Sequence, residues 1–599
     1  MLKRKFDEML SQGKGRQLLW LFGLCLALIL LAVLVSKFVF RDGALVWQDV
    51  VAIFLSAGAF RGAGVHDVFR LMLALLGVFL FSALLVSVVK NIFDNISESV
   101  RKGRRYYRVH DHVLILGGGR HLSQMLRELS LQEDEHDVLV MTSQDVEQLR
   151  DKLQADTEDR KFTDRIIFYA GGLNNMEVLA HAHPEKAYRI YIIGEDDEPD
   201  HDSLSLDCLT ILDEVCWGAE RKIPCFLLME SATSMDIFNY SEHEITQEGS
   251  FLQVELVSND EYNAECLFRQ VKDGVPFIPT LRKQNPEWLH LVIVGTDQKA
   301  LAVSATAAHI CHFPDFTDGR RRHTQITFLA PGAGSLEQEF KAVHENIFSV
   351  KGLELDVDWD FREGNVFQED VRRDLVSWLE AGQVVRVVFC QRNLENRAKC
   401  LIHLPREVYG HPNFASAIYL DSDSWFIHKA QETEMYGTIF TFGPAEENAD
   451  PLFVERFAKG KRANHVYATH GHTEQGDVDA EWNALSRASR FSSVYSANGY
   501  DLRRRCFDFL NKDRRSVYEA EHRRWVMSEL LMGFWPVTDE ERKVLDSLQG
   551  KPDEFKEKAD EYKRCFRHHL IREYVDETDR DLNRLFIDHI DYILGENGE

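Results

Sequence analysis

Two uncharged apolar runs near the start of the chain constrain its fold more than any other feature. They cover residues 18–36 and 71–89. At a rise of about 1.5 Å per helical residue, each run nearly crosses a hydrocarbon core of ~30 Å. We therefore predict two membrane spans, at about 17–38 and 69–90. A signal peptide is the alternative for the first run, but no small-x-small cleavage site follows Ser36.

The basic residues around these runs predict the orientation of the hairpin. Loops with an excess of Lys and Arg stay in the cytosol. Five basic residues precede the first run, namely Lys3, Arg4, Lys5, Lys14 and Arg16. Five follow the second run, namely Arg101, Lys102, Arg104, Arg105 and Arg108. We expect a multi-pass protein of the cell (inner) membrane, in contact with membrane lipid, with both termini cytoplasmic and the intervening loop outside.

The loop between the runs is too apolar for an ordinary external loop and too short to span. Irregular backbone at membrane depth survives only where it lines a cavity or is buried in protein. We predict a re-entrant loop at 46–64, because glycine suits a filter whose carbonyls point inward. The predicted pore residues are Ser56, Ala57, Gly58, Ala59, Phe60, Arg61 and Gly62. The alternative is an amphipathic external loop in a two-span anchor. Arg61 repeated around an axis would oppose cations, so potassium selectivity does not follow.

Composition limits the partners of the remaining chain. The net charge of −26 argues against nucleic acid as a partner, because counterion release needs a basic face. The ten cysteines show no regular spacing and no CxxC pair, which fits free thiols in a reduced cytosol.

The first cytosolic segment carries a strand, a glycine turn and a helix in succession. Residues 112–116 form an apolar run that leads into three consecutive glycines. This arrangement is typical of the first βα turn of a dinucleotide-binding fold, where phosphate approaches a helix N-terminus. Candidate ligand-binding residues are Gly117, Gly118, Gly119, Arg120 and Ser143. The ribose-binding acid expected at the end of the second strand is absent from Thr142-Ser143-Gln144, which argues against NAD.

An acidic run follows the fourth predicted strand of this segment. Such a run, at the carboxyl end of a parallel strand, lies where ligands bind open sheets. Oxygen ligands at this density suit a divalent cation such as Ca²⁺. The candidate metal ligands are Glu195, Asp196, Asp197 and Asp200. The alternative is a solvated acidic loop that precedes the next helix.

A second segment repeats the strand and helix alternation. It begins at residues 289–294 and keeps a single glycine, Gly295, so a phosphate site is not expected there. Further strands are predicted at 325–329, 353–357, 384–390, 417–420 and 437–442. The fold class is a multi-domain membrane protein. It has a two-helix hairpin with a re-entrant loop, two α/β Rossmann-like domains and an all-α C-terminal domain. The predicted boundaries are 1–104, 105–285, 286–449 and 450–599.

The order of these features resembles a known channel family. An arginine-rich linker precedes "HVLILGGG", and "IIFYAGGLNNMEVLAHAHPEKAYRIYIIGEDDEPDHDSLSLDCLTIL" follows. Residues 1–450 resemble Castor/Pollux-like ion channels with regulator-of-K⁺-conductance domains. The resemblance implies spans and a filter, followed by paired Rossmann-like domains that assemble as a gating ring.

The C-terminal segment resembles a second family. Residues 518–535 read "YEAEHRRWVMSELLMGFW", and "RANHVYA" precedes them at 462–468. Residues 452–597 resemble the RyR domain, the repeat found in ryanodine receptors. On a helix, His522 and Trp525 share one face beside Glu521, and these three are candidate ligand-binding residues. The alternative is that His522 and Trp525 only pack helices together.

Together these features predict a ligand-gated ion channel, with cations as the expected permeant ion. We expect a homotetramer with a cytosolic gating ring and a RyR-like sensor or assembly domain. A nucleotide or Ca²⁺ is the expected regulatory ligand. No nucleophile–base pair or paired acids point to catalysis, so we expect no enzyme. The alternative function is a membrane-anchored, nucleotide-sensing effector or scaffold in a stress or antiviral response, without a selective pore.

Overall fold

The computed structural model describes most of the chain after residue 64. The described ranges are 65–119, 121–131, 136–156, 160–163, 165–195, 200–230, 250–281, 288–315, 323–444, 452–510 and 514–595, with single positions between 23 and 38. The chain divides into two compact units. The first contains Met1–Tyr107, Asp145–Glu147 and Phe168–Ala170, and the second contains the other residues after 107.

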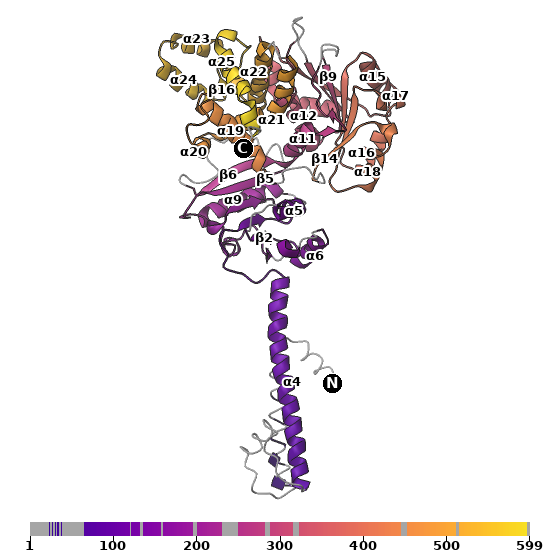
Figure 1. Cartoon of the computed structure of the whole chain (residues 1–599), viewed down its shortest axis with the longest axis vertical. Coiled ribbons are helices and arrows are strands. Elements are labelled where there is room, and N and C mark those ends of the chain that lie inside the picture. The colour runs from indigo at the N-terminus through magenta and orange to yellow at the C-terminus, as the bar shows by residue number, and fades with distance from the viewer. Residues whose placement is uncertain are drawn as a thin grey trace. The chain divides into compact units, whose positions relative to one another are not determined.

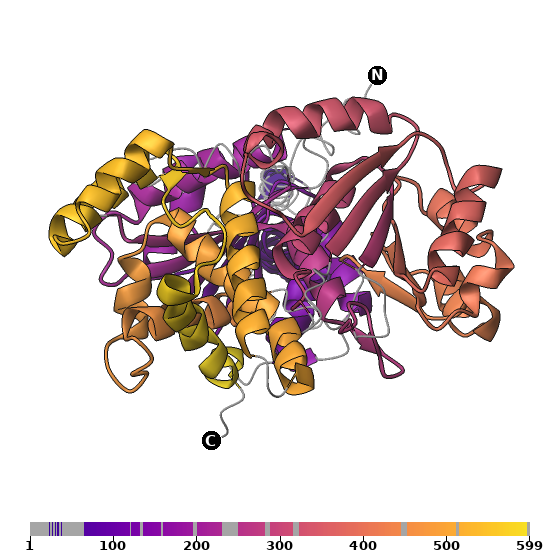
Figure 2. The ribbon, with the colours of Figure 1, turned by 90° about the horizontal axis from the view of Figure 1, so that it is seen from above.

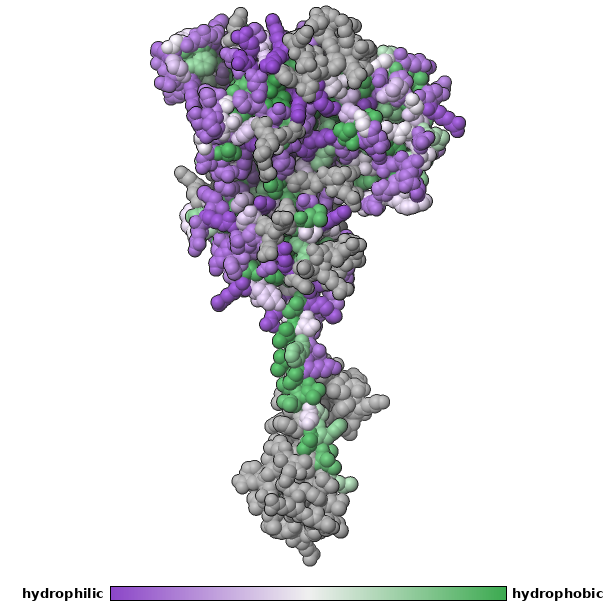
Figure 3. Space-filling view, in the orientation of Figure 1, coloured by the Kyte–Doolittle hydropathy of each residue, from purple (hydrophilic) through white to green (hydrophobic). Residues whose placement is uncertain are grey.

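The main element of the first unit is helix α4, Val65–Arg101, which contains the second apolar run (Figure 1). Figure 3 shows apolar side chains along this helix, and Met72, Phe79 and Val86 are each more than 60% exposed. Among the described residues, no helix combines the length and apolarity that a membrane crossing requires. The predicted loop 46–64, with all seven pore residues, lies outside the described residues, as does most of the first predicted span.

Helix α4 ends at a glycine that fixes the direction of the following chain. Gly103 has φ +64°, and the Arg104 N–H donates to the Ser99 carbonyl at 2.8 Å. This left-handed cap satisfies carbonyls that the last turn would leave without partners. The Gly103 carbonyl accepts from Ala170 N–H at 2.8 Å, and the Tyr107 N–H donates to the Tyr169 hydroxyl at 2.6 Å. Within this unit, α4 is therefore tied to the end of strand β3.

The chain after Tyr107 begins with a parallel six-stranded sheet of order β3-β2-β1-β4-β5-β6. Its strands are β1 Val113–Leu116, β2 Val138–Thr142, β3 Ile166–Ala170, β4 Arg189–Ile192, β5 Ile223–Met229 and β6 Leu252–Ser258. Its helices include α5 Leu122–Leu131, α6 Val146–Asp156, α8 Met176–Ala180, α9 His201–Val215 and α11 Asn259–Arg269. The chain order reverses between β1 and β4, which is where open parallel sheets bind ligands.

A second six-stranded parallel sheet has the same topology, with order β11-β10-β9-β12-β13-β14. Its strands are β9 Trp288–Val294, β10 His323–Leu329, β11 Val357–Arg362, β12 Val384–Phe389, β13 Phe414–Tyr419 and β14 Ile439–Phe442. Its helices include α12 Gln298–Ile310, α13 Ala333–Val343, α14 Glu345–Ser349, α15 Glu369–Glu380, α16 Leu394–Ile402 and α18 Trp425–Gln431. Apolar residues of β9, β12 and β13 form its core with α15 and α16. The two predicted Rossmann-like sheets are thus present.

The C-terminal region is helical, as predicted, apart from one short parallel strand pair, β15 Trp535–Pro536 and β16 Arg567–His568. Its helices are α19 Val454–Ala468, α20 Val478–Asn483, α21 Arg487–Leu510, α22 Arg514–Leu531, α23 Asp539–Ser547, α24 Pro552–Arg564, α25 Asp576–Asp588 and α26 Ile590–Leu594. Helices α21 and α22 pack on α12 of the second sheet, and Figure 2 shows the orange α21 and α22 beside it.

Candidate ligand site at the glycine turn of the first sheet

The turn after β1 brings two strand ends into close contact. Gly117 has φ +119°, and a Cβ atom at this position would lie 2.0 Å from the Gly194 carbonyl oxygen. The Gly119 N–H donates to the same carbonyl at 3.2 Å. Only glycine permits both the backbone conformation and the contact. The turn therefore fixes the end of β1 against the end of β4.

The residue after Gly194 places a carboxylate inside this turn. Glu195 Oε2 accepts from Gly118 N–H at 2.9 Å and from Gln144 Nε2 at 2.8 Å. Its Oε1 accepts from the Thr142 hydroxyl at 2.6 Å and from Ser143 N–H at 2.9 Å. We call Gly118, Thr142, Ser143 and Gln144 the donor nest. Four donors from two strand ends converge on one anion supplied by a third.

Burial distinguishes the nest from an ordinary surface contact. The Glu195 residue is 7% exposed and Thr142 is fully buried, whereas Ser143 is exposed. The nest therefore lies at the carboxyl ends of β1 and β2, and its Ser143 side is open to solvent. Two backbone N–H groups and two side-chain donors are the kind of set that cradles phosphate or carboxylate oxygens.

The structure brings together part of the predicted ligand set, and it describes only two of the four predicted metal ligands, Glu195 and Asp200. Gly117, Gly118, Gly119 and Ser143 meet at this turn, but Arg120 lies outside the described residues. Both oxygens of Glu195 are already engaged by the nest, so they are not free metal ligands. Asp196 and Asp197 lie outside the described residues, and Asp200 is the N-cap residue of α9. The described residues contain no group of His, Cys, Asp or Glu that would hold a metal ion.

A histidine at the start of α9 supports the loop that carries Glu195. His201 Nε2 lies 3.0 Å from the Ile193 carbonyl oxygen and its Nδ1 lies 3.0 Å from Asp202 Oδ1. Burial lowers the pKa of His201. The hydrogen bond to Asp202 and the nearby charge of Glu230 outweigh this effect, so the pKa is raised above its usual value. Acceptors at both ring nitrogens favour the protonated imidazole.

The corresponding turn of the second sheet shows a looser approach of the two strand ends, without a carboxylate. Gly295 has φ +142°, and a Cβ atom there would lie 3.3 Å from the Cys390 carbonyl carbon and from the Gln391 nitrogen. The next polar side chain, Gln391, donates to Cys400 Sγ at 3.3 Å. Asp297 accepts from Ala300 N–H at 3.2 Å and caps α12. Among the described residues of this turn, no donor nest surrounds an acid.

Helix α22 carries the three predicted ligand residues Glu521, His522 and Trp525, and each of them contacts a neighbouring element. Glu521 is buried between two guanidinium groups, at 3.2 Å from Arg503 Nε and 2.9 Å from Arg524 Nε. His522 Nε2 lies 2.9 Å from the Arg572 carbonyl oxygen, and burial lowers its pKa. Trp525 packs edge-on against His568, with ring centroids 5.0 Å apart. The helix-packing alternative accounts for all these contacts.

Buried ion pairs join the helical region to both sheets. Arg456 of α19 binds Glu265 of α11 through two bonds of 2.9 and 2.8 Å. Arg523 of α22 binds Asp356, immediately before β11, at 2.9 Å. Burial alone would raise the pKa of Asp356, but His312 and Arg523 lower it well below its usual value. Arg456 and Arg523 thus hold helices α19 and α22 against neighbouring elements.

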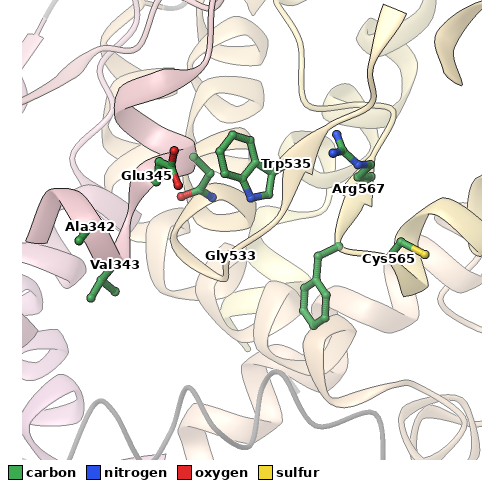
Figure 4. A pocket seen from close by; sticks show the side chains of 9 residues that line it. Ala342, Val343, Glu345, Gly533, Trp535, Cys565 and Arg567 are labelled. Atoms are coloured by element: carbon green, nitrogen blue, oxygen red, sulfur yellow. The ribbon is translucent and has the colours of Figure 1, made fainter. Parts of the chain in front are cut away.

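One cavity lies between the second sheet domain and the helical region. Its volume is about 420 Å³, and Figure 4 shows Ala342, Val343 and Glu345 on one side and Trp535, Cys565 and Arg567 on the other. The Asn346 amide closes one wall by donating to the carbonyls of Leu530 and Phe534. Glu345 and Cys565 are exposed, and the half-buried Arg567 donates to the Pro536 carbonyl at 3.3 Å.

Comparisons with known proteins place the fold in context. No protein-family model matches the sequence, and no curated protein matches it. Among solved structures, the chain is similar to GsuK bound to ADP, with 12% identity over 74% of this chain and 98% of that chain, and a TM-score of 0.37. It is similar to the GsuK RCK domain, with 11% identity, coverage of 58% and 79%, and a TM-score of 0.32.

A third similar structure is the human SLO3 gating ring, with 8% identity, coverage of 55% and 80%, and a TM-score of 0.32. None of these three similar structures is named for a ryanodine-receptor repeat.

Proposed function

We propose that this chain is the subunit of a ligand-gated cation channel, in which the two sheets and the C-terminal helices form the cytosolic regulatory part. The observation that carries the proposal is the donor nest at the switch point of the first sheet. It is an anion-binding arrangement at the position where open parallel sheets bind ligands. A phosphate-bearing nucleotide is the ligand that this chemistry suits best.

The link between α4 and β3 supports a regulatory role. Gly103 and Tyr107 follow the apolar helix directly, and both are hydrogen-bonded to the end of β3. The end of β3 is therefore hydrogen-bonded to the residues that directly follow the helix with the second apolar run. A ligand shifts an equilibrium only by its differential affinity for the two states.

The pore part of the proposal rests on the sequence of the loop at 46–64 and on the apolar character of α4. Its exposed apolar side chains need an apolar partner, and lipid or further copies of the chain would supply one. We place both termini in the cytosol from the distribution of basic residues. Four copies around an axis would place the glycine-rich tract at the centre.

We further propose that the helical C-terminal region is an assembly part and that the chain binds its ligand without converting it. The buried ion pairs to both sheets support the assembly role. Within the described residues, Glu521, His522 and Trp525 are occupied by packing contacts, which leaves the donor nest as the ligand site.

Cysteine accessibility tests the channel proposal. Ser56→Cys, Ala59→Cys and Ala63→Cys in the full chain should each make conductance sensitive to a membrane-impermeant thiol reagent applied from outside. Ser547→Cys, an exposed position of α23, is the control and should not respond. If none of the three loop variants responds, the loop does not line a conduction path. A nucleotide-sensing membrane anchor would then be the better account.

A further inference from the structure

The donor nest is already occupied by an anion of the same chain. We propose that Glu195 is a displaceable internal occupant of a phosphate-binding site, and that its carboxylate sets how tightly the first sheet binds a phosphate-bearing ligand. This inference rests on the proposed ligand-regulated function and specifies how the site is controlled. The first observation is that the Glu195 carboxylate accepts all four of these hydrogen bonds, two of them from backbone N–H groups.

The donors converge from strand ends that are separated in sequence. Gly118 follows β1, Thr142 ends β2, and Glu195 follows β4. A phosphate at the N-terminus of α5 would need the Gly118 N–H that Glu195 now uses. The incoming anion and the carboxylate therefore compete for the same donor groups. Because both carry negative charge, they also repel each other when they are close together.

The second sheet indicates that the fold itself does not need this acid. The second sheet has the same strand order, and the corresponding glycine, Gly295, also has positive φ and faces the neighbouring strand end at a larger distance. The residues at the corresponding strand end are Cys390 and Gln391, and neither is an acid. A sheet of this topology therefore forms without a carboxylate in that place. We accordingly attribute Glu195 to the ligand site and not to the folding of the sheet.

The open side of the nest gives a ligand access. Ser143 is exposed and Gln144 is partly exposed, while Gly118 and Thr142 are buried behind them. There is little room for both anions, because even a Cβ atom at Gly118 would lie 2.6 Å from Thr142 Oγ1 and 3.0 Å from Glu195 Oε2. Binding of phosphate therefore requires the carboxylate to leave.

Titration calorimetry with ADP on the full-length chain tests the inference. Glu195→Ala should lower the Kd for ADP at least about tenfold relative to wild type, because it removes the competing charge. Adenosine, which lacks the phosphates, should show no such gain. Glu214→Ala, which removes an exposed carboxylate on α9 of the same domain, is the matched control and should bind like wild type. Adding Gly118→Val to Glu195→Ala should abolish the gain by filling the nest.

Three outcomes would overturn the inference. They are an unchanged or higher Kd for ADP in folded Glu195→Ala, an equal gain for adenosine and ADP, and a gain that survives Gly118→Val. If Glu195→Ala does not fold, the isosteric Glu195→Gln decides, and a folded variant without a gain refutes the idea. Failure of both variants to fold also refutes it, because a displaceable occupant is not essential to folding.

The readout separates this inference from the channel proposal. Binding is measured without any flux, so a chain that passes no current but shows the ADP pattern would keep the inference and refute the channel. A nucleotide-gated current that is unchanged in Glu195→Ala would support the channel proposal and refute this inference.

Discussion

The buried ion pair between Arg456 and Glu265 gives the sharpest stability prediction. The two side chains are 1% and 3% exposed and share two hydrogen bonds, of 2.9 and 2.8 Å. Arg456→Ala removes both bonds and leaves a buried carboxylate without its cation. Breaking such a pair from one side costs about 3–5 kcal/mol, whereas replacing both partners with apolar residues is close to neutral.

We therefore expect Arg456→Ala to lower the unfolding temperature of the full-length chain strongly, and Arg456→Met with Glu265→Leu to restore most of the loss. Arg456→Lys keeps the charge but loses the two-pronged contact, so an intermediate loss is expected. The control is Lys341→Ala, which breaks an exposed i,i+4 pair with Glu337 and should cost only ~0–1 kcal/mol. The unfolding transition is followed by differential scanning fluorimetry. If Arg456→Ala behaves like Lys341→Ala, the helical region is not held to the first sheet in this way.

Three further perturbations probe the first sheet. The raised pKa of His201 means that its contribution to stability is complete below its unfolded value of 6.5 and is lost as pH rises through the folded pKa. The unfolding temperature of wild type should therefore fall from about pH 6 to about pH 8 more than that of His201→Gln, and parallel pH profiles would contradict this. Gly117→Ala should destabilise more than Gly218→Ala, because both positions have positive φ but only Gly117 adds a clash with Gly194; equal losses in chemical denaturation would refute this reasoning. Tyr169→Phe removes the hydroxyl that accepts the Tyr107 N–H, so it should weaken ligand-dependent current while ADP affinity stays unchanged; an equal loss of both would argue against coupling through this contact.

Much of the fold could be predicted from local pattern, and the exceptions have physical causes. Strands β1, β3, β4 and β9 follow from apolar runs that lead into glycine, and β2 follows from its apolar run alone. Strand β5 was missed because Pro224 is its second residue, and proline argues against a central strand; its ladder to β4 starts only at Cys225. Strand β11 was placed too early, at 353–357, because the observed Val357–Arg362 carries alternating acids, which an edge strand tolerates.

The candidate site was predictable only in part. The glycine turn and Ser143 could be identified from the strand–glycine–helix order, and the absence of an acid at the end of β2 was visible. That Glu195, which follows β4, fills the space at the end of β2 depends on how distant strand ends converge, and no spacing rule encodes it. Thr142 and Gln144 were missed as donors for the same reason. The three predicted residues of α22 are Glu521, His522 and Trp525. Neighbouring elements, which the helical spacing does not reveal, determine the contacts that each side chain makes.

Recording the current of the purified full-length chain in a planar bilayer, while ADP is titrated, tests the central claim most directly. The claim is that a phosphate-bearing ligand regulates a pore by replacing Glu195 in the donor nest. We expect ADP to change the open probability, and the half-maximal concentration to fall at least about tenfold in Glu195→Ala, with Glu214→Ala unchanged. A cation current that is insensitive to ADP in all three proteins, or no current at all, would contradict the claim.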